Sequence, residues 1–235
     1  MSTQLDRPAA AASLPSPAHD DDRLSRLSAR FGIAFTVCQL SVMVLMAVVV
    51  LPHGGSPDDP ALVRGRAVLD AEAVYRYGNY VFMLAGSLLL GFLGAVHVRL
   101  RRADASGVLA TVAVVSGTLL ALIWPLAGVL HDVALDTAVG GADPLVLAGW
   151  DSVAPYSLAF SALPRLFFVG AIVLALRMTG RSPWLQRTGA VLLPLSLVGS
   201  ATLVADGLFP LLAVSTLGYE LWVGAVAWHW LRSSR

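Results

Sequence analysis

The feature of this sequence that most limits its possible folds is a succession of six apolar runs, each about 20 residues long. They cover residues 31–51, 79–100, 108–130, 156–176, 188–205 and 208–231. A helix of about 20 apolar residues is long enough to cross the hydrocarbon core of a bilayer. Backbone amides find no water there, so only helices and closed barrels span the core, and runs without alternation exclude barrel strands. We therefore predict an all-α fold, a six-helix transmembrane bundle.

The composition agrees with a membrane location. Hydrophobic residues make up 57% and charged residues 13% of the 235 positions, whereas soluble domains have about 25% charged residues. The net charge of +1 argues against nucleic acid as a partner, because phosphate backbones require a clustered basic surface. The expected location is the plasma membrane, with the lipid bilayer as the main partner.

The arginines are distributed unequally between the two sides of the predicted bundle. The side with both termini and the loops after the second and fourth spans holds Arg7, Arg23, Arg26, Arg30, Arg99, Arg101, Arg102, Arg177, Arg181, Arg187, Arg232 and Arg235. The opposite side holds Arg64, Arg66 and Arg76 together with most of the acidic residues. Because cytoplasmic loops carry the excess of arginine, both termini are predicted to be cytoplasmic.

Two segments outside the apolar runs have a recognisable character. Residues 1–30 are rich in Ala, Pro, Ser and Asp and have no periodic apolar face, so we predict a disordered cytoplasmic tail before a transmembrane domain of residues 31–235. Residues 61–77 contain Arg66 with Asp70 and Glu72 with Arg76 at i,i+4 spacing. This second segment predicts a surface helix in the first outer loop, lying over the mouth of the bundle.

Two ionisable residues lie deep in the apolar runs, Arg165 in the fourth and Glu220 in the sixth. At 1.5 Å per residue they lie roughly 14 Å and 18 Å below the starts of their spans, so their depths are similar. A lone charge near the midplane costs about 2.5–3.5 kcal/mol, and we therefore expect the two side chains to contact each other. One interpretation is a structural ion pair that fixes helix register. The other is a polar floor to a cavity, in which Glu220 titrates or binds a substrate group.

The candidate catalytic acids are three carboxyls that lie in or beside apolar segments, Asp132, Asp206 and Glu220. Removal from water favours the protonated form of a carboxyl, which is the form that a proton donor needs.

A metal site has weak support in the sequence. His131, Asp132, Asp136 and Asp151 are the best available ligands, but no tight spacing of His and Asp recurs among them. Cys38 is the only cysteine and lies inside an apolar run, where it acts as a small hydrophobe. We predict neither a metal nor a cofactor.

Aromatic side chains cluster towards the outer half of the predicted bundle. The candidate substrate-binding residues are Trp124, Trp150, Tyr156, Phe160 and Arg165. Trp124 precedes Pro125, where a helix kink turns the ring into the bundle. Ring faces attract cations, so a wall of such rings suits the guidance of a carbocation. The alternative for most aromatics is the interfacial belt of membrane proteins.

The plan of 235 residues, six spans, an outer helix after the first span and an outer loop with Trp150 and Asp151 before the fourth resembles a broad set of bacterial six-span proteins. That set is similar to the small membrane-bound terpene cyclases of bacterial indole-sesquiterpenoid pathways. The resemblance rests on layout, and it implies protonation of a terminal alkene or epoxide of a prenylated substrate, followed by ring closure.

We therefore expect a membrane-bound enzyme that acts on an isoprenoid or other lipidic small molecule by acid-initiated cyclisation. One alternative is a small-solute transporter or channel subunit, in which Arg165 and Glu220 serve as the transported-charge or gating pair. Another is a non-enzymatic accessory membrane protein that binds the helices of a partner. A homo-oligomer is compatible with each.

Overall fold

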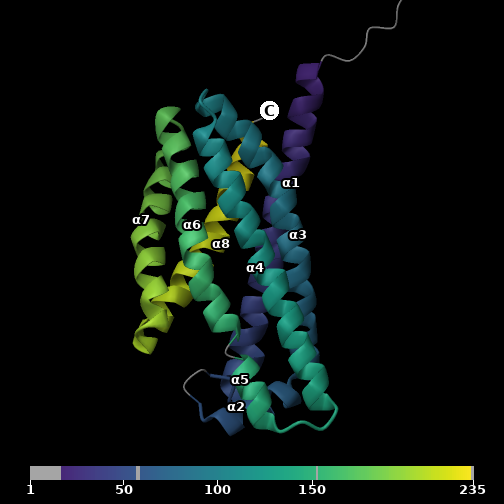
Figure 1. Ribbon diagram of the computed structural model, residues 1–235. Coiled ribbons are helices and arrows are strands. Elements are labelled where there is room, and N and C mark those ends of the chain that lie inside the picture. The colour runs from purple at the N-terminus through teal and green to yellow at the C-terminus, as the bar shows by residue number, and fades with distance from the viewer. Residues whose placement is uncertain (1–16, 57–58, 152, 234–235) are drawn as a thin grey trace, which may run out of the picture.

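The computed structural model describes residues 17–56, 59–151 and 153–233 (Figure 1). Within these ranges, the side chains of residues 17–22, 150, 151, 153–155 and 206 lie outside the description. The described residues form helices and turns without a strand, which confirms the all-α prediction. The α-helices are α1 (Pro17–Leu45), α2 (Ala61–Asp70), α3 (Glu72–Ala103), α4 (Val108–Val139), α5 (Pro144–Asp151), α6 (Val153–Met178), α7 (Pro183–Ser200) and α8 (Phe209–Ser233).

Among the described residues, five helical segments are long and apolar enough to cross a membrane, as a multi-pass membrane protein requires. They are Arg23–His53, Glu72–Ala103, Val108–Val139, Tyr156–Met178 and Phe209–Ser233. The first segment consists of α1 from Arg23 onward, a π-helical stretch, Met46–Val50, and a 3-10 turn, Leu51–His53. The α7 helix has 18 residues and contains Arg187 and Pro194, which lower its apolar character.

The long helices pack in a closed ring. Going around it, α1 packs on α3, α3 on α4, α4 on α6, α6 on α7, α7 on α8, and α8 returns to α1 (Figure 1). The core at the centre of the ring includes Phe35 of α1, Phe92 of α3, Phe168 of α6 and Trp222 of α8. This arrangement directs one face of each helix inward, and side chains on α6 and α8 meet across the centre.

The α1 helix begins earlier than the sequence indicates. The sequence predicts residues 17–30 to belong to the tail, but they are helical from Pro17 onward, and residues 1–16 lie outside the described ranges. Ser28 is buried against α3, where its hydroxyl donates to the backbone carbonyl of Gly91 and accepts from the backbone N–H of Ala95 at 2.6 Å. Small residues at this point let α1 approach α3. Residues 17–30 therefore have the composition of a disordered tail although they form a helix that packs on α3.

The α3 and α4 helices approach each other closely around Gly86. A Cβ atom at Gly86 would lie 2.4 Å from the carbonyl oxygen of Ala121 and 2.4 Å from Cγ of Pro125. A real side chain therefore does not fit there without moving backbone. Asp104 organises the turn between the two helices, because its carboxylate accepts from the Ser106 hydroxyl at 2.6 Å and from the Leu109 N–H at 3.1 Å. These two bonds hold the pKa of Asp104 below its ordinary value.

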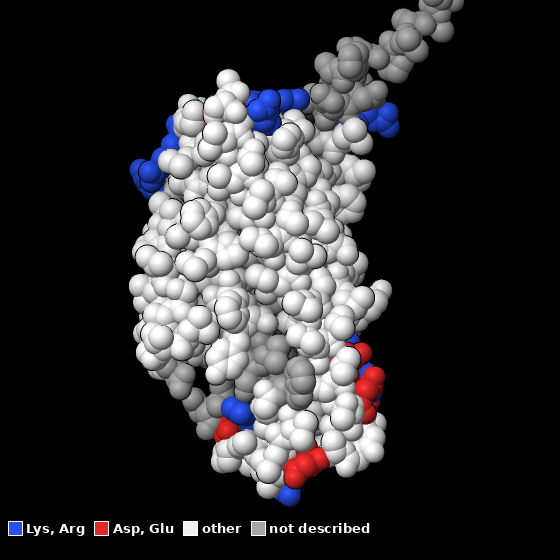
Figure 2. All heavy atoms as spheres, in the orientation of Figure 1, with Lys and Arg blue, Asp and Glu red and all other residues white. Residues whose placement is uncertain are grey.

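The two ends of the bundle differ in charge. Arginines gather at the end that holds the α3–α4 and α6–α7 turns, which we call the arginine end, whereas acidic side chains gather at the other end, the acidic end (Figure 2). The short helices α2 and α5 lie side by side at the acidic end (Figure 1). They touch so closely that a Cβ at Gly65 of α2 would lie 1.9 Å from the carbonyl oxygen of Pro144 in α5.

The predicted surface helix is therefore present, but it is shorter than expected. It ends at Asp70, and Ala71 leaves helical geometry with φ −102° and ψ 22°. Residues 72–77 belong instead to α3, since Glu72 starts that helix. The partner helix α5 covers residues that the sequence alone assigned to a loop.

Candidate functional site

Among the described charged side chains, that of Arg165 is the most deeply buried, and it points from α6 into the centre of the ring with an exposed fraction of 0%. Its Nη1 donates to the hydroxyls of Ser215 at 3.3 Å and Thr216 at 3.0 Å, both on α8. Its Nη2 donates to the Ser161 hydroxyl, one turn earlier on α6, at 2.6 Å. Hydroxyl groups thus replace water around the guanidinium.

Tyr219 supplies the next contact to Arg165. The guanidinium carbon lies 5.1 Å from the centroid of the Tyr219 ring, within the range of a cation–π interaction. Phe35 and Phe168 meet the same ring edge-on, with centroid distances of 6.5 Å and 6.2 Å. Edge-on packing is favourable for aromatic rings and holds Tyr219 in place under the cation.

Glu220 follows Tyr219 on α8, and its exposed fraction is 2%. Its backbone carbonyl accepts from the Thr36 hydroxyl of α1 at 2.8 Å. Its carboxyl is less well satisfied, because no donor among the described residues reaches Oε2. A buried carboxyl oxygen without a partner is costly in a native structure, so it calls for a polar group supplied from elsewhere.

The predicted direct contact between Arg165 and Glu220 is not formed. The depths agree and each side chain acts on the other electrostatically, but the described ion pairs within 4 Å all involve Arg76. Magnitudes explain the difference: three hydroxyl bonds of about 0.6–2 kcal/mol each offset the roughly 2.5–3.5 kcal/mol cost of a midplane charge. Arg165 therefore does not require a carboxylate as its immediate partner.

Three buried polar atoms of this cluster lack a hydrogen-bond partner in the described part of the chain. They are Nε of Arg165, the hydroxyl oxygen of Tyr219 and Oε2 of Glu220. Buried polar atoms are normally satisfied by protein, ordered water or ligand. Their concentration at one place makes the Arg165–Tyr219–Glu220 cluster the best candidate for a functional site.

A second group of charges lies at the acidic end and centres on Arg76 of α3. Arg76 pairs with Glu72 at 2.7 Å, Asp136 at 2.7 Å and Asp132 at 3.5 Å. Asn79 also donates to Asp132 at 3.3 Å. The sequence spacing predicted the Glu72–Arg76 pair, but the bridge from Arg76 to α4 depends on tertiary packing and was not anticipated.

Asp132 occupies an environment that differs from the expected apolar one. Its side chain is 43% exposed and lies 3.5 Å from the guanidinium of Arg76, so it is neither enclosed by apolar side chains nor without a partner. Of the other candidate acids, Asp206 lies in the 3-10 turn Asp206–Leu208, and its side chain is outside the description. Glu220 is the candidate acid that the structure places in the interior.

The candidate substrate-binding aromatics do not form one wall. Trp124 is buried and packs on Phe82 with ring centroids 5.2 Å apart. Tyr156 and Phe160 point out from α6, with exposed fractions of 56% and 66%. Trp150 lies in α5, and its side chain is outside the description.

The residues considered for a metal site contact different partners. His131 is buried and stacks on Tyr75 at a centroid distance of 5.0 Å. Asp132 and Asp136 join the Arg76 network, and the side chain of Asp151 is outside the description. Over the part of the chain that the structure describes, no three His, Cys, Asp or Glu side chains are grouped as a metal would require.

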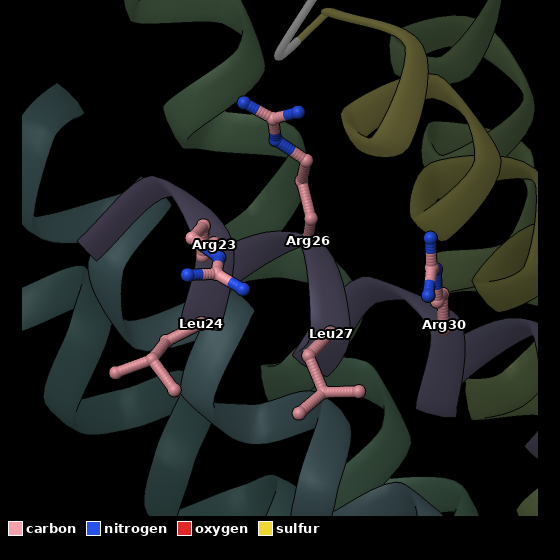
Figure 3. Close-up of a pocket in the computed structure, with 5 residues that line it drawn as sticks. All are labelled: Arg23, Leu24, Arg26, Leu27 and Arg30. Atoms are coloured by element: carbon pink, nitrogen blue, oxygen red, sulfur yellow. The ribbon is translucent and has the colours of Figure 1, made fainter. Parts of the chain in front are cut away.

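A basic hollow of about 650 Å³ lies beside the first turns of α1 (Figure 3). Arg26 and Arg30 extend to one side of the helix, and Leu24 and Leu27 extend to the other (Figure 3). Alternation of this kind suits the boundary between water and the lipid headgroups. It matches the arginine excess of that end and does not add chemistry to the buried cluster.

No protein-family model, no curated protein and no solved structure matches this chain.

Proposed function

We propose that the chain crosses the plasma membrane six times with both termini in the cytoplasm. The 18 residues of α7 rise about 27 Å, and the 3-10 turn Ala201–Leu203 adds about 6 Å, which together match a core of roughly 30 Å. The position of α7 between α6 and α8 in the ring supports the same conclusion. The arginine end is then the cytoplasmic end.

Reporter fusions test this topology. A fusion after Asp143 should report the outer side, whereas fusions after Arg181 and after Arg235 should both report the cytoplasm. If α7 lies on the surface instead of crossing, the fusion after Arg235 will report the outer side, and the six-span topology fails.

The proposed activity is acid-initiated cyclisation of an isoprenoid lipid, with Glu220 as the acid. The observation that carries this proposal is the buried Glu220 carboxyl, whose Oε2 has no partner among the described residues. An ionisable group inside a membrane-spanning helix is costly and is therefore a functional candidate by default. Asp132 is a weaker candidate because it is half-exposed and paired with Arg76.

The neighbours of Glu220 suit this role. The rings of Phe35, Phe168 and Tyr219 pack around the cluster, and ring faces stabilise a nearby carbocation by about 2 kcal/mol when desolvated. Arg165 stays with its hydroxyl partners, and its positive charge stabilises the carboxylate that Glu220 becomes after it has given up its proton. Because Glu220 is 2% exposed, a substrate reaches it only when α8 moves away from its neighbours.

The reaction conserves all atoms. Glu220 gives its proton to a terminal alkene carbon or an epoxide oxygen, the resulting cation is attacked by a second alkene, and a new carbon–carbon bond closes the ring. Loss of a proton from the cyclic cation back to Glu220 restores the acid. The product has the mass of the substrate.

Membranes that contain the full chain should therefore convert a farnesylated or geranylgeranylated acceptor into a product of equal mass and altered retention. Glu220→Gln keeps the shape of the side chain and removes the acid, so turnover should fall by 10²-fold or more, as is typical for a lost general acid. Glu72→Gln is the matched control, because Glu72 is a half-exposed glutamate of the Arg76 network. Asp206→Asn tests the remaining candidate.

Two results would overturn this activity. One is the absence of an isomerised product from every prenylated substrate, and the other is full turnover by Glu220→Gln. If proteoliposomes then show solute or proton flux that depends on Glu220, the transporter interpretation replaces the enzyme.

A further inference from the structure

A narrow cleft lies at the arginine end, between the C-terminal turns of α3, α6 and α8. Its volume is about 50 Å³, compared with the roughly 10–15 Å³ that one water molecule requires. It therefore has room for one small polyatomic group and not for a nucleotide. Among the described residues, apolar side chains line most of it, and its polar lining comes from Arg99, Thr179, Arg181, His229 and Ser233.

The polar lining of this cleft consists of two arginines, one histidine and two hydroxyl groups. Arg99 of α3, Arg181 after α6 and His229 of α8 come from three different elements, and both arginines act electrostatically on the imidazole. Thr179 and Ser233 add hydroxyl donors. The described lining includes no carboxylate, so the cleft favours an anionic ligand.

Ser182 gives independent support, because it holds a strained backbone conformation next to the cleft. Among the described residues it is the one non-glycine residue with positive φ, at 53°. Its hydroxyl meets the His229 ring at 2.7 Å from Nε2. Strain of this kind costs of order 1–3 kcal/mol and persists where the surroundings fix it, often at ligand sites. Here it fixes the orientation of an imidazole that lines the cleft.

A competing explanation is that the arginines only neutralise the carbonyls at helix C-termini. That explanation fits Arg99, whose Nη2 donates to the carbonyl of Trp230 at 3.2 Å. It does not explain Arg181, because the final carbonyls of α6 are already bonded. The N–H of Arg181 and Nε2 of Gln186 both donate to the Leu176 carbonyl, at 3.2 Å and 3.1 Å.

We propose that this cleft binds one anionic phosphate group through Arg181, His229 and Arg99. Guanidinium groups bind phosphate oxygens with short, charge-assisted bonds. Basic pockets between membrane helices at the cytoplasmic surface bind the headgroups of anionic lipids. The phosphate comes either from such a headgroup or from free phosphate in the cytoplasm. The site is independent of Glu220 and of the proposed cyclisation.

Thermal unfolding of the full chain in neutral detergent separates the two sources. In one arm phosphatidylglycerol is added, with phosphatidylcholine as its control. In the other arm inorganic phosphate is added, with chloride at equal ionic strength as its control. A rise of the midpoint with phosphatidylglycerol alone identifies a lipid headgroup, and a rise with inorganic phosphate identifies the free ion. If neither phosphatidylglycerol nor inorganic phosphate raises the midpoint, the proposal is overturned.

Variants locate the effect. Arg181→Gln and His229→Gln should each weaken the apparent affinity roughly tenfold or more, since each removes a charge-assisted or polar contact. Arg177→Gln is the matched control, because Arg177 lies one turn earlier, is exposed and does not line the cleft. Equal affinity in Arg181→Gln and wild type would refute the site.

A measurement on the wild-type chain covers the case in which a variant fails to fold. The ligand that raises the midpoint should slow modification of His229 by diethylpyrocarbonate several-fold, read by peptide mass spectrometry. His53 is the internal control, since it is exposed and lies in the 3-10 turn Leu51–His53, far from the cleft. Equal modification of His229 with and without the ligand would place the phosphate elsewhere and overturn the proposal.

Discussion

Replacement of Gly86 by alanine tests the close approach of α3 and α4 on which the ring depends. The new Cβ would lie 2.4 Å from the carbonyl oxygen of Ala121 and 2.4 Å from Cγ of Pro125. Neither atom belongs to a flexible side chain, so relief requires the helices to separate. Overpacking of this kind destabilises by about 1–3 kcal/mol, whereas alanine gains about 1 kcal/mol of helix propensity over glycine.

Gly78→Ala in the same helix is the matched control. Its Cβ would meet only Cγ1 of Val42 at 3.7 Å, an ordinary contact. The propensity gain is common to both variants and cancels in their difference, which leaves the overpacking term of about 1–3 kcal/mol. For a chain of this size that is a difference of roughly 2–12 °C in the unfolding midpoint.

Thermal unfolding in detergent, followed by tryptophan fluorescence, measures both variants. Trp124 is a suitable reporter, because it is buried against Phe82 and precedes Pro125. We expect Gly86→Ala to unfold below Gly78→Ala. If Gly86→Ala is as stable as the control or more stable, the two helices do not approach as closely as described.

Three other predictions each test one contact of the structure. Thr216→Val should cost about 1 kcal/mol in the wild type but little in an Arg165→Met background, because the hydroxyl serves the guanidinium; additive losses in the double-mutant cycle would contradict this contact. Since folding lowers the pKa of Asp104, its stabilising effect is present above its ordinary pKa and is lost as pH falls through the folded value. The midpoint gap between wild type and Asp104→Ala should therefore narrow progressively as pH falls below about 4, and a gap that stays constant over that range would argue against the Ser106 and Leu109 bonds. Gly65→Ala should speed hydrogen exchange in α2 and α5 while leaving α8 unchanged, since its Cβ would collide with the Pro144 carbonyl; unchanged exchange in α5 would contradict that contact.

The long helices and the depth of the buried charges could be predicted because both depend on position along one helix. Length and hydropathy identify a span, and a rise of 1.5 Å per residue places Arg165 and Glu220 at similar depths. The partner of a side chain depends also on rotation about the helix axis and on the neighbours there. Hydroxyls at Ser161, Ser215 and Thr216 reach the guanidinium, and sequence spacing does not show which face they share with it.

The start of α1 and the Arg76 network were missed for a similar reason. Ser28 lies in a segment with the composition of a flexible tail, and its hydrogen bonds to Gly91 and Ala95 show that this segment is part of a packed helix. Arg76 has an obvious partner one turn away in Glu72, but its bond to Asp136 crosses to another helix. Local patterns identify local pairs, and contacts between distant segments require the fold.

The contact between α2 and α5 makes some helices of the bundle harder to displace than others. The α2 helix belongs to the connection from α1 to α3, and α5 belongs to the connection from α4 to α6, so their contact ties two hairpins together at the acidic end. The connection from α7 to α8 is a pair of 3-10 turns, and Val204, which lies between them, is 87% exposed. We therefore expect the hairpin of α7 and α8 to yield first when the ring opens. Glu220 lies on that hairpin, so under the proposed function a lipidic substrate would enter from the side, between the helices, and would not pass the contact of α2 with α5 at the acidic end.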